Sequence, residues 1–163
     1  MQNLLRLHTF VICAYKESPY LEECVESLKN QEQQSNILMV TSTPNEYIEK
    51  ISRKYGIELK INTGQGGIVQ DWNFAYRQCK TPYITIAHQD DIYFKDYAAR
   101  AIKMLEQSKK PLIYFSDYCE IRNGQRVTSN RLLQVKRILL FPLRGRLFKD
   151  STFVRRRSLS LGS

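Results

Sequence analysis

The stretch that decides the fold is residues 8–28, which read HTFVICAYKESPYLEECVESL. Residues 8–15 form a nearly continuous apolar run rich in strand-forming residues, which is typical of a strand covered on both faces. Ser18 and Pro19 stand where the N-cap and the first-turn proline of a helix belong. Apolar side chains then recur at helical spacing over residues 21–28. The stretch predicts a buried strand followed directly by an amphipathic helix.

The same alternation of strand and helix recurs along the chain. Residues 37–41 predict a second strand, and the Thr43-Pro44-Asn45-Glu46 sequence has the spacing of a capping box that opens a helix through about Tyr55. Such alternation predicts an α/β fold, with a mostly parallel sheet flanked by helices. The other predicted elements are strands at 57–61, 83–87 and 112–116, a helix with Trp72, Ala75, Tyr76 and Cys79 on one face, and a helix with Tyr97, Ala98, Ala101, Ile102 and Leu105 on its inner face.

The last third of the chain follows a different pattern. Residues 118–128 surround Asn123-Gly124, the dipeptide that favours a type I′ turn, so they predict a β-hairpin. Residues 131–140 have the spacing of an amphipathic basic helix, which Pro142 would end.

Composition and charge limit the class of protein to which the chain can belong. The 163 residues are 42% hydrophobic, which suits one globular domain and excludes disordered and low-complexity chains. Residues 1–121 contain 14 basic and 15 acidic residues, whereas residues 122–163 contain 11 and 1. This basic segment, residues 122–163, favours an anionic surface, either membrane or nucleic acid, although an ordinary solvated charged face has the same composition.

The sequence also bears on cellular location. It has no run of about eighteen apolar residues, and its first residues lack the apolar core and the cleavage site of a signal peptide. We therefore expect a cytoplasmic protein. The four cysteines form no C-x-x-C pair and lie in apolar stretches, so we expect reduced, buried thiols.

Candidate functional residues follow the predicted strands, because ligands of open parallel sheets bind beyond the carboxyl ends of the strands. Asp90 and Asp91 follow one of these strands directly, beside His88 and Gln89. Two adjacent carboxylates are hard oxygen ligands suited to Mg²⁺ or Mn²⁺ that bridges a diphosphate. The alternative is that the pair merely begins the next helix, where the helix dipole favours acidic residues.

Other kinds of site are disfavoured. Residues 64–67 are glycine-rich but match neither the G-x-G-x-x-G fingerprint nor a P-loop, which argues against a classical dinucleotide or ATP site. The chain has only two histidines, His8 and His88, and no nucleophilic triad can be assembled from them. Trp72 has the spacing of a core residue.

Three segments together resemble the GT-A glycosyltransferases of family 2. Residues 10–28 look like the opening strand and helix of that family, after which the chain lines the nucleotide pocket. Residues 83–91 resemble the strand that delivers the D-x-D metal motif, and Gly66 to Asn73 stand where the family has its glycine-led helix near the nucleoside. The resemblance covers about residues 8–121.

The resemblance implies a nucleotide-sugar donor, a Mn²⁺ or Mg²⁺ ion on its diphosphate, and inverting transfer to an acceptor hydroxyl. Asp90 would hold the metal with Asp91, which would also lie near the donor sugar. Two departures from the family pattern leave the nucleobase open: His88 stands at the first Asp of D-x-D, and Thr41-Ser42-Thr43 replaces an acidic residue often found after the second strand. The residues that would bind the nucleotide are Ala14, Tyr15, Glu17, Thr41, Asp71 and His88.

The resemblance also implies a division of the chain. Residues 1–121 would form the nucleotide-sugar-binding domain, and residues 122–163 would begin an incomplete acceptor-binding region. Family members normally carry their catalytic base beyond this point. Asp117 is the only acidic residue after a late predicted strand, and we interpret it as a substrate or structural residue before a base. We therefore expect a truncated chain that binds donor without transferring sugar to a specific acceptor.

The expected partners are a UDP-sugar and a saccharide or lipid-linked acceptor in surface polysaccharide synthesis. The basic segment would contact an anionic membrane, which places the protein in the cytoplasm or peripherally at the inner membrane face. Two alternatives stay open: a nucleic-acid-binding protein that uses the basic segment, and a non-catalytic remnant of a glycosyltransferase. The basic segment has few interleaved aromatic residues, so specific nucleic-acid binding is not expected.

Overall fold

The structure is a computed structural model that describes residues 4–107, 109, 113–128 and 131–140. It consists of two compact units, residues 1–102 and residues 103–163. The predicted division after residue 121 is a functional one and stays a prediction.

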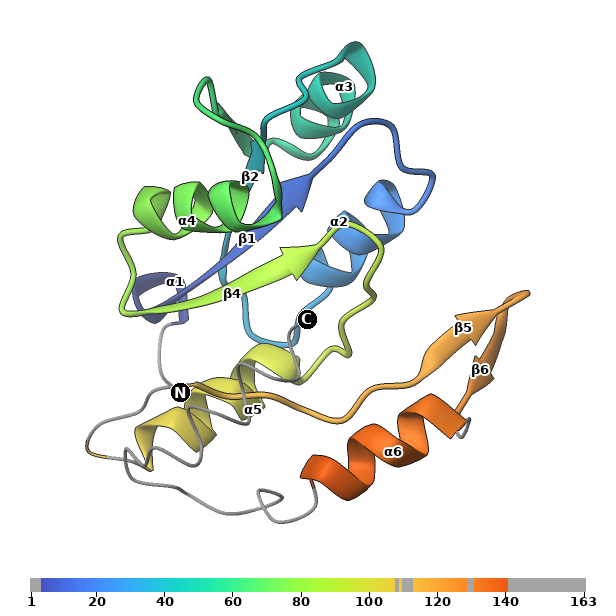
Figure 1. Ribbon diagram of the computed structural model, residues 1–163. Coiled ribbons are helices and arrows are strands. Elements are labelled where there is room, and N and C mark those ends of the chain that lie inside the picture. The colour runs from blue at the N-terminus through green and yellow to red at the C-terminus, as the bar shows by residue number, and fades with distance from the viewer. Residues whose placement is uncertain (1–3, 108, 110–112, 129–130, 141–163) are drawn as a thin grey trace. The chain divides into compact units, whose positions relative to one another are not determined.

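The first unit is built on a parallel sheet of strand order β3-β2-β1-β4 (Figure 1). β1 is central, with Thr9 paired to Asn36 on one side and to Ile84 on the other. The predicted α/β class with a mostly parallel sheet is confirmed. The strands are β1 (His8–Ala14), β2 (Asn36–Thr41), β3 (Glu58–Ile61) and β4 (Tyr83–His88).

Helices cover both faces of this sheet. Figure 1 shows α4 in front of the sheet and α2 behind it, as right-handed crossovers require when the chain reverses direction after β3. On the α4 face, Ala75 packs in one buried cluster with Val11 and Val40. The helices are α1 (Leu4–Leu7), α2 (Leu21–Lys29), α3 (Glu46–Tyr55), α4 (Ile68–Gln78) and α5 (Tyr97–Glu106).

The central strand is covered on both faces, as its apolar run predicts. Phe10, Val11 and Ile12 are completely buried although they alternate between the two faces of the sheet. Phe10 lies opposite the α4 face, and its ring contacts those of Tyr93 and Tyr97 at centroid distances of 5.6 and 6.1 Å.

The predicted helix caps are wrong in detail. α2 begins at Leu21 after Tyr20 and has no side-chain cap, so Ser18 is not its N-cap. The N-cap of α3 is Asn45, whose side-chain oxygen accepts a hydrogen bond from the Ile48 backbone N–H at 2.9 Å. Thr43 is not the N-cap, and its hydroxyl instead accepts a hydrogen bond from the Lys16 backbone N–H of another loop.

The predicted inner faces of two helices have different outcomes. In α5, the expected Ala98, Ala101 and Ile102 are buried. In α4 only Ala75 is buried, and Tyr76, expected on the same face, is 66% exposed. Neighbouring residues are about 100° apart on a helix, so a stripe one residue wide holds Ala75 inside and leaves Tyr76 outside.

The second unit contains the predicted hairpin and helix. β5 (Glu120–Arg122) and β6 (Gln125–Val127) pair around Asn123 and Gly124, whose φ angles of 50° and 74° are those of a type I′ turn. Helix α6 (Arg131–Leu140) has the expected bounds. Pro142 and the end of the basic segment lie outside the described residues.

The predicted strand at residues 112–116 is wrong over its described part. Residues 113–116 belong to no strand, and Leu112 lies outside the described residues. Ile113 and Phe115 are exposed, which a covered strand does not allow. An apolar run predicts burial, but it does not supply the partner strand that a sheet needs.

The cysteines are all free thiols, but only Cys24 is buried. Cys13, Cys79 and Cys119 are half-buried, so the expectation of burial was wrong for these three. Among the described residues, no helix has the length and apolar character needed to cross a bilayer.

Candidate functional site

The candidate site lies at the carboxyl ends of β1, β2 and β4. β1 is followed by a helix behind the sheet, whereas β4 is reached from a helix in front of it (Figure 1). Ligands of open α/β sheets bind beyond the carboxyl ends of the strands at such a reversal. The loops after β1 and β4 meet at this point.

Gln89 joins these two loops across the reversal. Its Oε1 accepts a hydrogen bond from the Tyr15 backbone N–H at 2.9 Å, and its Nε2 donates to the Tyr15 carbonyl at 3.0 Å. The amide thereby fixes the loop after β1 against the residue that precedes Asp90. Sequence reasoning did not select Gln89, because nothing in the sequence shows which side chain spans two loops 74 residues apart.

Lys16 has a strained backbone in the same loop. Its φ of 53° lies in the left-handed region, which side chains other than that of glycine rarely adopt. Its backbone N–H donates to Thr43 Oγ1 at 2.7 Å, which ties the loop after β1 to the loop after β2. The Thr41 hydroxyl in turn accepts from the Thr43 N–H at 3.0 Å. Thr41 is buried and its hydroxyl is bonded within its own loop, so its side chain does not face solvent.

Asp71 connects α4 to the loops after β2 and β3. Its two carboxylate oxygens accept hydrogen bonds from Ser42 Oγ and Asn62 Nδ2, each at 2.8 Å. Gly66 lies close by, where an added Cβ would stand 3.2 Å from Ser42 Oγ. Asp71 therefore holds the loop of residues 62–67, a role that its predicted contact with nucleotide did not include.

Asp90 and Asp91 form a pair of exposed carboxylates directly after β4. Partial desolvation raises the pKa of Asp91; the nearby His88 opposes this rise, and the charge of Asp90 adds to it. Among the described residues, neither carboxylate makes an ion pair. Two uncompensated carboxylates side by side are a suitable partner for a divalent cation.

His88 is not brought into a three-ligand cluster with this pair. The described residues contain no group of three His, Cys, Asp or Glu side chains that could hold a metal ion. The His88 ring instead packs edge-on against Trp72, with centroids 5.3 Å apart. A cation at Asp90 and Asp91 would take its other ligands from water and from phosphate oxygens, as Mg²⁺ commonly does in proteins.

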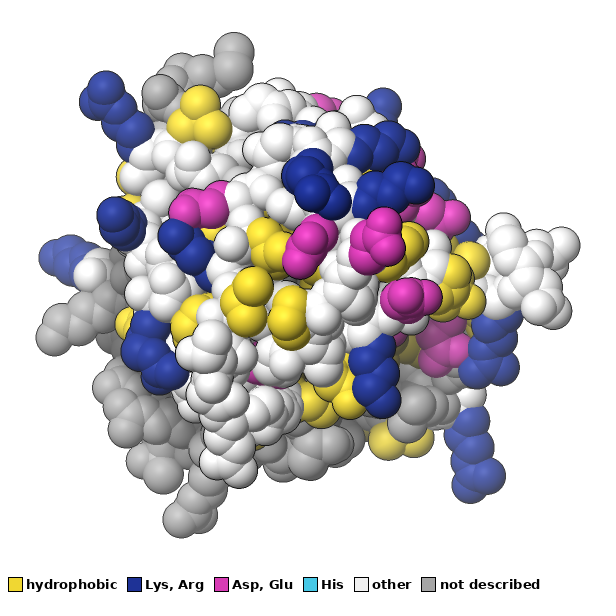
Figure 2. All heavy atoms as spheres, turned by 90° about the horizontal axis from the view of Figure 1, so that it is seen from above, with side chains coloured by type: hydrophobic (Ala, Val, Ile, Leu, Met, Phe, Trp, Pro, Cys, Tyr) yellow, Lys and Arg dark blue, Asp and Glu magenta, His cyan; other side chains and the backbone are white. Residues whose placement is uncertain are grey.

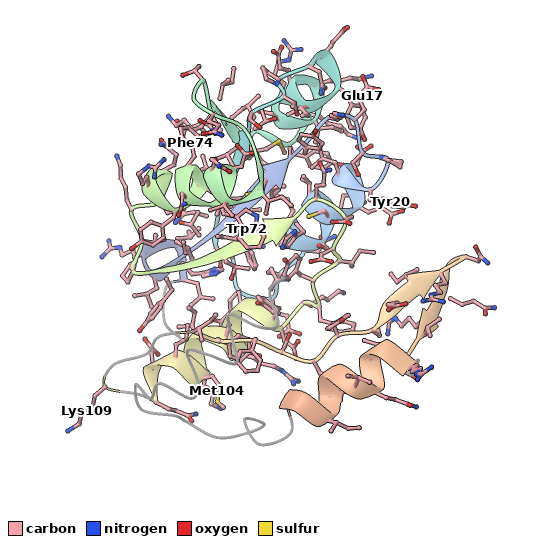
Figure 3. All side chains as sticks on the ribbon, viewed as in Figure 1. Glu17, Tyr20, Trp72, Phe74, Met104 and Lys109 are labelled. Atoms are coloured by element: carbon pink, nitrogen blue, oxygen red, sulfur yellow. The ribbon has the colours of Figure 1, made fainter. Side chains whose placement is uncertain are left out.

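The three residues expected to contact base and ribose lie at the end of β1 and on the loop that follows it. Ala14 is buried at the end of the strand, so only its backbone can face a ligand. Tyr15 and Glu17 are exposed, and Figure 3 shows Glu17 on the connection between β1 and α2. The Lys16 Nζ lies 5.1 Å from the centre of the Tyr15 ring, at cation–π distance.

The charge at this edge is negative. In the loops of residues 14–19, 41–45, 62–67 and 88–94, Lys16 is the only basic residue, against the three carboxylates of Glu17, Asp90 and Asp91. Figure 2 shows Lys and Arg side chains beside Asp and Glu side chains on the face seen from above. A diphosphate would be repelled from these loops unless a cation entered with it.

Asp117 lies in the second unit and is held by an arginine. Arg137 Nε donates to both of its carboxylate oxygens, at 3.1 and 3.0 Å. The same guanidinium donates to the carbonyls of Thr128 and Tyr118. These contacts give the Asp117 carboxylate a structural partner in Arg137, and the role of Asp117 as a base stays a prediction.

The parallel sheet flanked by helices and the similar solved structures define the class as a GT-A fold. One similar solved structure is S. aureus TarS, with a TM-score of 0.55 and 16% identity over 62% of this chain and 20% of that chain. Another is the mannosyltransferase PcManGT from Pyrobaculum calidifontis in complex with GDP-Man and Mn²⁺, with a TM-score of 0.53 and 21% identity over 60% of this chain and 32% of that chain. These identities show the fold alone.

The family follows from the sequence match. The model for glycosyl transferase family 2 matches residues 9–162, and the chain belongs to this family. It spans about a fifth of TarS and a third of PcManGT. A search of curated proteins finds no match. The expected resemblance to GT-A glycosyltransferases of family 2 is thus confirmed.

Proposed function

We propose that this chain provides the donor-binding part of an inverting, metal-dependent glycosyltransferase, with a UDP-sugar as its donor. The observation that carries the proposal is the Gln89 bridge, which joins the carboxylate pair after β4 to the Tyr15 loop after β1. A nucleotide sugar needs these two surfaces together, because its nucleoside and its diphosphate are recognised by different chemistry.

Asp90 and Asp91 would hold Mn²⁺ or Mg²⁺ together with the donor diphosphate. The two carboxylates fit this role because they are exposed, adjacent and without ion pairs among the described residues. When bound, the cation supplies positive charge that stabilises the departing diphosphate. The complex of PcManGT with GDP-Man and Mn²⁺ supports the same pair of ligand classes here.

The chain's own side chains would bind and orient the donor. Exposed Tyr15 and Glu17 offer an aromatic face and a carboxylate to base and ribose. Lys16 is the one cation of the edge loops and would attract phosphate. Gln89 and Thr43 fix the backbone of this loop, so less conformational entropy is lost when the donor binds.

The proposal also includes the acceptor and the cellular location of the reaction. A saccharide or lipid-linked acceptor would receive the sugar in surface polysaccharide synthesis at the cytoplasmic face of a membrane. The charge of residues 122–163, with 11 basic residues and one acidic residue, supports attraction to an anionic membrane surface.

The test is a calorimetric titration of the full chain with UDP, with and without Mn²⁺. We expect binding that depends on Mn²⁺, and Asp90→Asn should weaken the Mn²⁺-dependent binding at least about tenfold, because changes to metal-supporting groups commonly cost that much. Asp96→Asn is the matched control, since Asp96 pairs with Arg100 in an exposed i,i+4 bridge. Equal UDP binding without Mn²⁺, or in Asp90→Asn, would contradict the proposal.

A further inference from the structure

The segment that carries Asp90 and Asp91 is attached to α2 at both of its ends. Cys24 Sγ donates a hydrogen bond to the His88 carbonyl at 3.2 Å, and the Tyr93 backbone N–H donates to Ser27 Oγ at 3.1 Å. Cys24 and Ser27 are three residues apart and therefore share one face of the helix. The two carboxylates lie between the attached residues. Figure 1 shows the chain after β4 passing α2.

The Ser27 hydroxyl is oriented for this contact. Its proton is donated to the Cys24 carbonyl at 2.7 Å, which leaves its oxygen lone pairs for the Tyr93 N–H. The helix beneath it is rigidly packed, because Leu21, Val25 and Leu28 are buried almost completely. The attachment therefore joins the carboxylate segment to the core.

The attachment continues toward α5. Gln31, which is 3% exposed, donates through Nε2 to the Phe94 carbonyl at 2.8 Å and accepts at Oε1 from the Ala98 N–H at 3.1 Å. The Glu32 N–H donates to the Lys95 carbonyl at 2.8 Å. The chain that leaves the carboxylates is thus fixed as far as the start of the next helix.

The carboxylates are close enough to influence the attached thiol. Burial is the main reason that the pKa of Cys24 rises to about 12, and the charges of Asp91 and Asp90 raise it further. The thiol therefore stays protonated at neutral pH and can act as a hydrogen-bond donor to the His88 carbonyl.

We propose that Cys24 and Ser27 are positioning residues that hold the two ends of the Asp90–Asp91 segment on α2 and so fix the two carboxylates in the arrangement that a divalent cation needs. The inference rests on the proposed function, because it assigns α2 a part in the same metal site. It adds a second layer to that site, on a helix that contributes no ligand.

The experiment compares UDP binding, with and without Mn²⁺, in Ser27→Ala, Ser27→Thr and Cys24→Ala. Ser52→Ala is the matched control: Ser52 is a buried serine on α3 whose hydroxyl donates to the Ile57 carbonyl at 2.6 Å, remote in sequence from the carboxylates. We expect Ser27→Ala to weaken Mn²⁺-dependent binding about tenfold. Thr keeps the hydroxyl and should restore most of that loss, and the control should lower thermal stability alone.

The outcomes separate this inference from the proposed function. If the unaltered chain binds UDP without Mn²⁺, the proposed function fails. If the unaltered chain needs Mn²⁺ and Ser27→Ala and Cys24→Ala both bind like Ser52→Ala, only the inference is overturned. An equal loss of Mn²⁺-dependent binding in Ser27→Ala and Ser27→Thr would also overturn it, since the hydroxyl would then not be the cause.

Discussion

His8 illustrates how one buried side chain joins distant parts of the sheet. It is 1% exposed, and its two ring nitrogens lie 2.9 Å from Ser35 Oγ and from Thr85 Oγ1. A neutral imidazole has one donor and one acceptor, and a hydroxyl can meet either. In the neutral imidazole both ring nitrogens are therefore satisfied, one as donor and one as acceptor, whereas a charged ring in this buried site would lose its hydration.

This environment predicts a loss of stability in mild acid. Burial lowers the pKa of His8 from 6.5 to about 4, so between these values the unfolded chain binds a proton that the folded chain does not. The free energy of unfolding should then fall as the pH drops from about 6.5 to about 4, by up to about 3 kcal/mol from this residue. Urea unfolding at a series of pH values measures the effect.

His8→Gln provides the comparison, because a glutamine amide also offers a donor and an acceptor but does not titrate. Its stability should depend less on pH across the same interval. If the two proteins lost stability in parallel, other groups would be responsible.

At the scale of the element, the start of α3 shows two neighbouring side chains with separate tasks. Asn45 caps the helix, whereas Thr43 binds the Lys16 N–H of another loop. A capping pattern in the sequence includes both residues and cannot tell them apart. The difference depends on where the loop after β1 passes.

These two tasks predict different effects when each residue is replaced by alanine. Asn45→Ala removes the cap and should cost about 1 kcal/mol of stability with little change in UDP binding. Thr43→Ala should weaken Mn²⁺-dependent UDP binding severalfold, because the Lys16 backbone loses the partner that fixes its left-handed conformation. Thermal unfolding and calorimetry on both variants check this. Weaker UDP binding in Asn45→Ala alone would reverse the assignment.

Sequence predicted the elements better than it predicted the links between them. The apolar run of β1 and the periodicity of α2 are local signals, so both elements were placed within about a residue or two. Asp90 and Asp91 could be selected because two adjacent carboxylates follow a predicted strand and because this segment resembles the one that carries the family's metal motif. Gln89 and Ser27 could not, because their importance depends on partners 74 and 66 residues away.

At the scale of the whole molecule, charge is distributed unevenly along the chain. In the described part of the second unit, Arg122 and Arg137 pair with Glu120 and Asp117, so the hairpin and α6 compensate part of their own charge. The acidic residues available for this are few, and residues 122–163 keep a large positive excess.

This excess predicts binding of the full chain to anionic lipid vesicles that weakens as salt is added, with little binding to neutral vesicles. Replacing Arg155, Arg156 and Arg157 together by Gln should weaken the binding about a hundredfold, since each basic residue near an anionic surface contributes about 1 kcal/mol. Vesicle sedimentation at several salt concentrations measures it. Equal binding to neutral vesicles would show that charge is not the cause.

The order of the strands also determines when the site can come into existence. β1 meets β2 across 27 residues of chain and β2 meets β3 across 20, but β1 meets β4 across 75. A nascent chain that has emerged as far as residue 80 already contains three of the four strands and lacks Gln89, Asp90 and Asp91. During synthesis the loop after β1, which we propose contacts the nucleoside, therefore exists before the carboxylates proposed to hold the metal, and the two halves of the candidate site are joined only when the last strand takes its place beside the first.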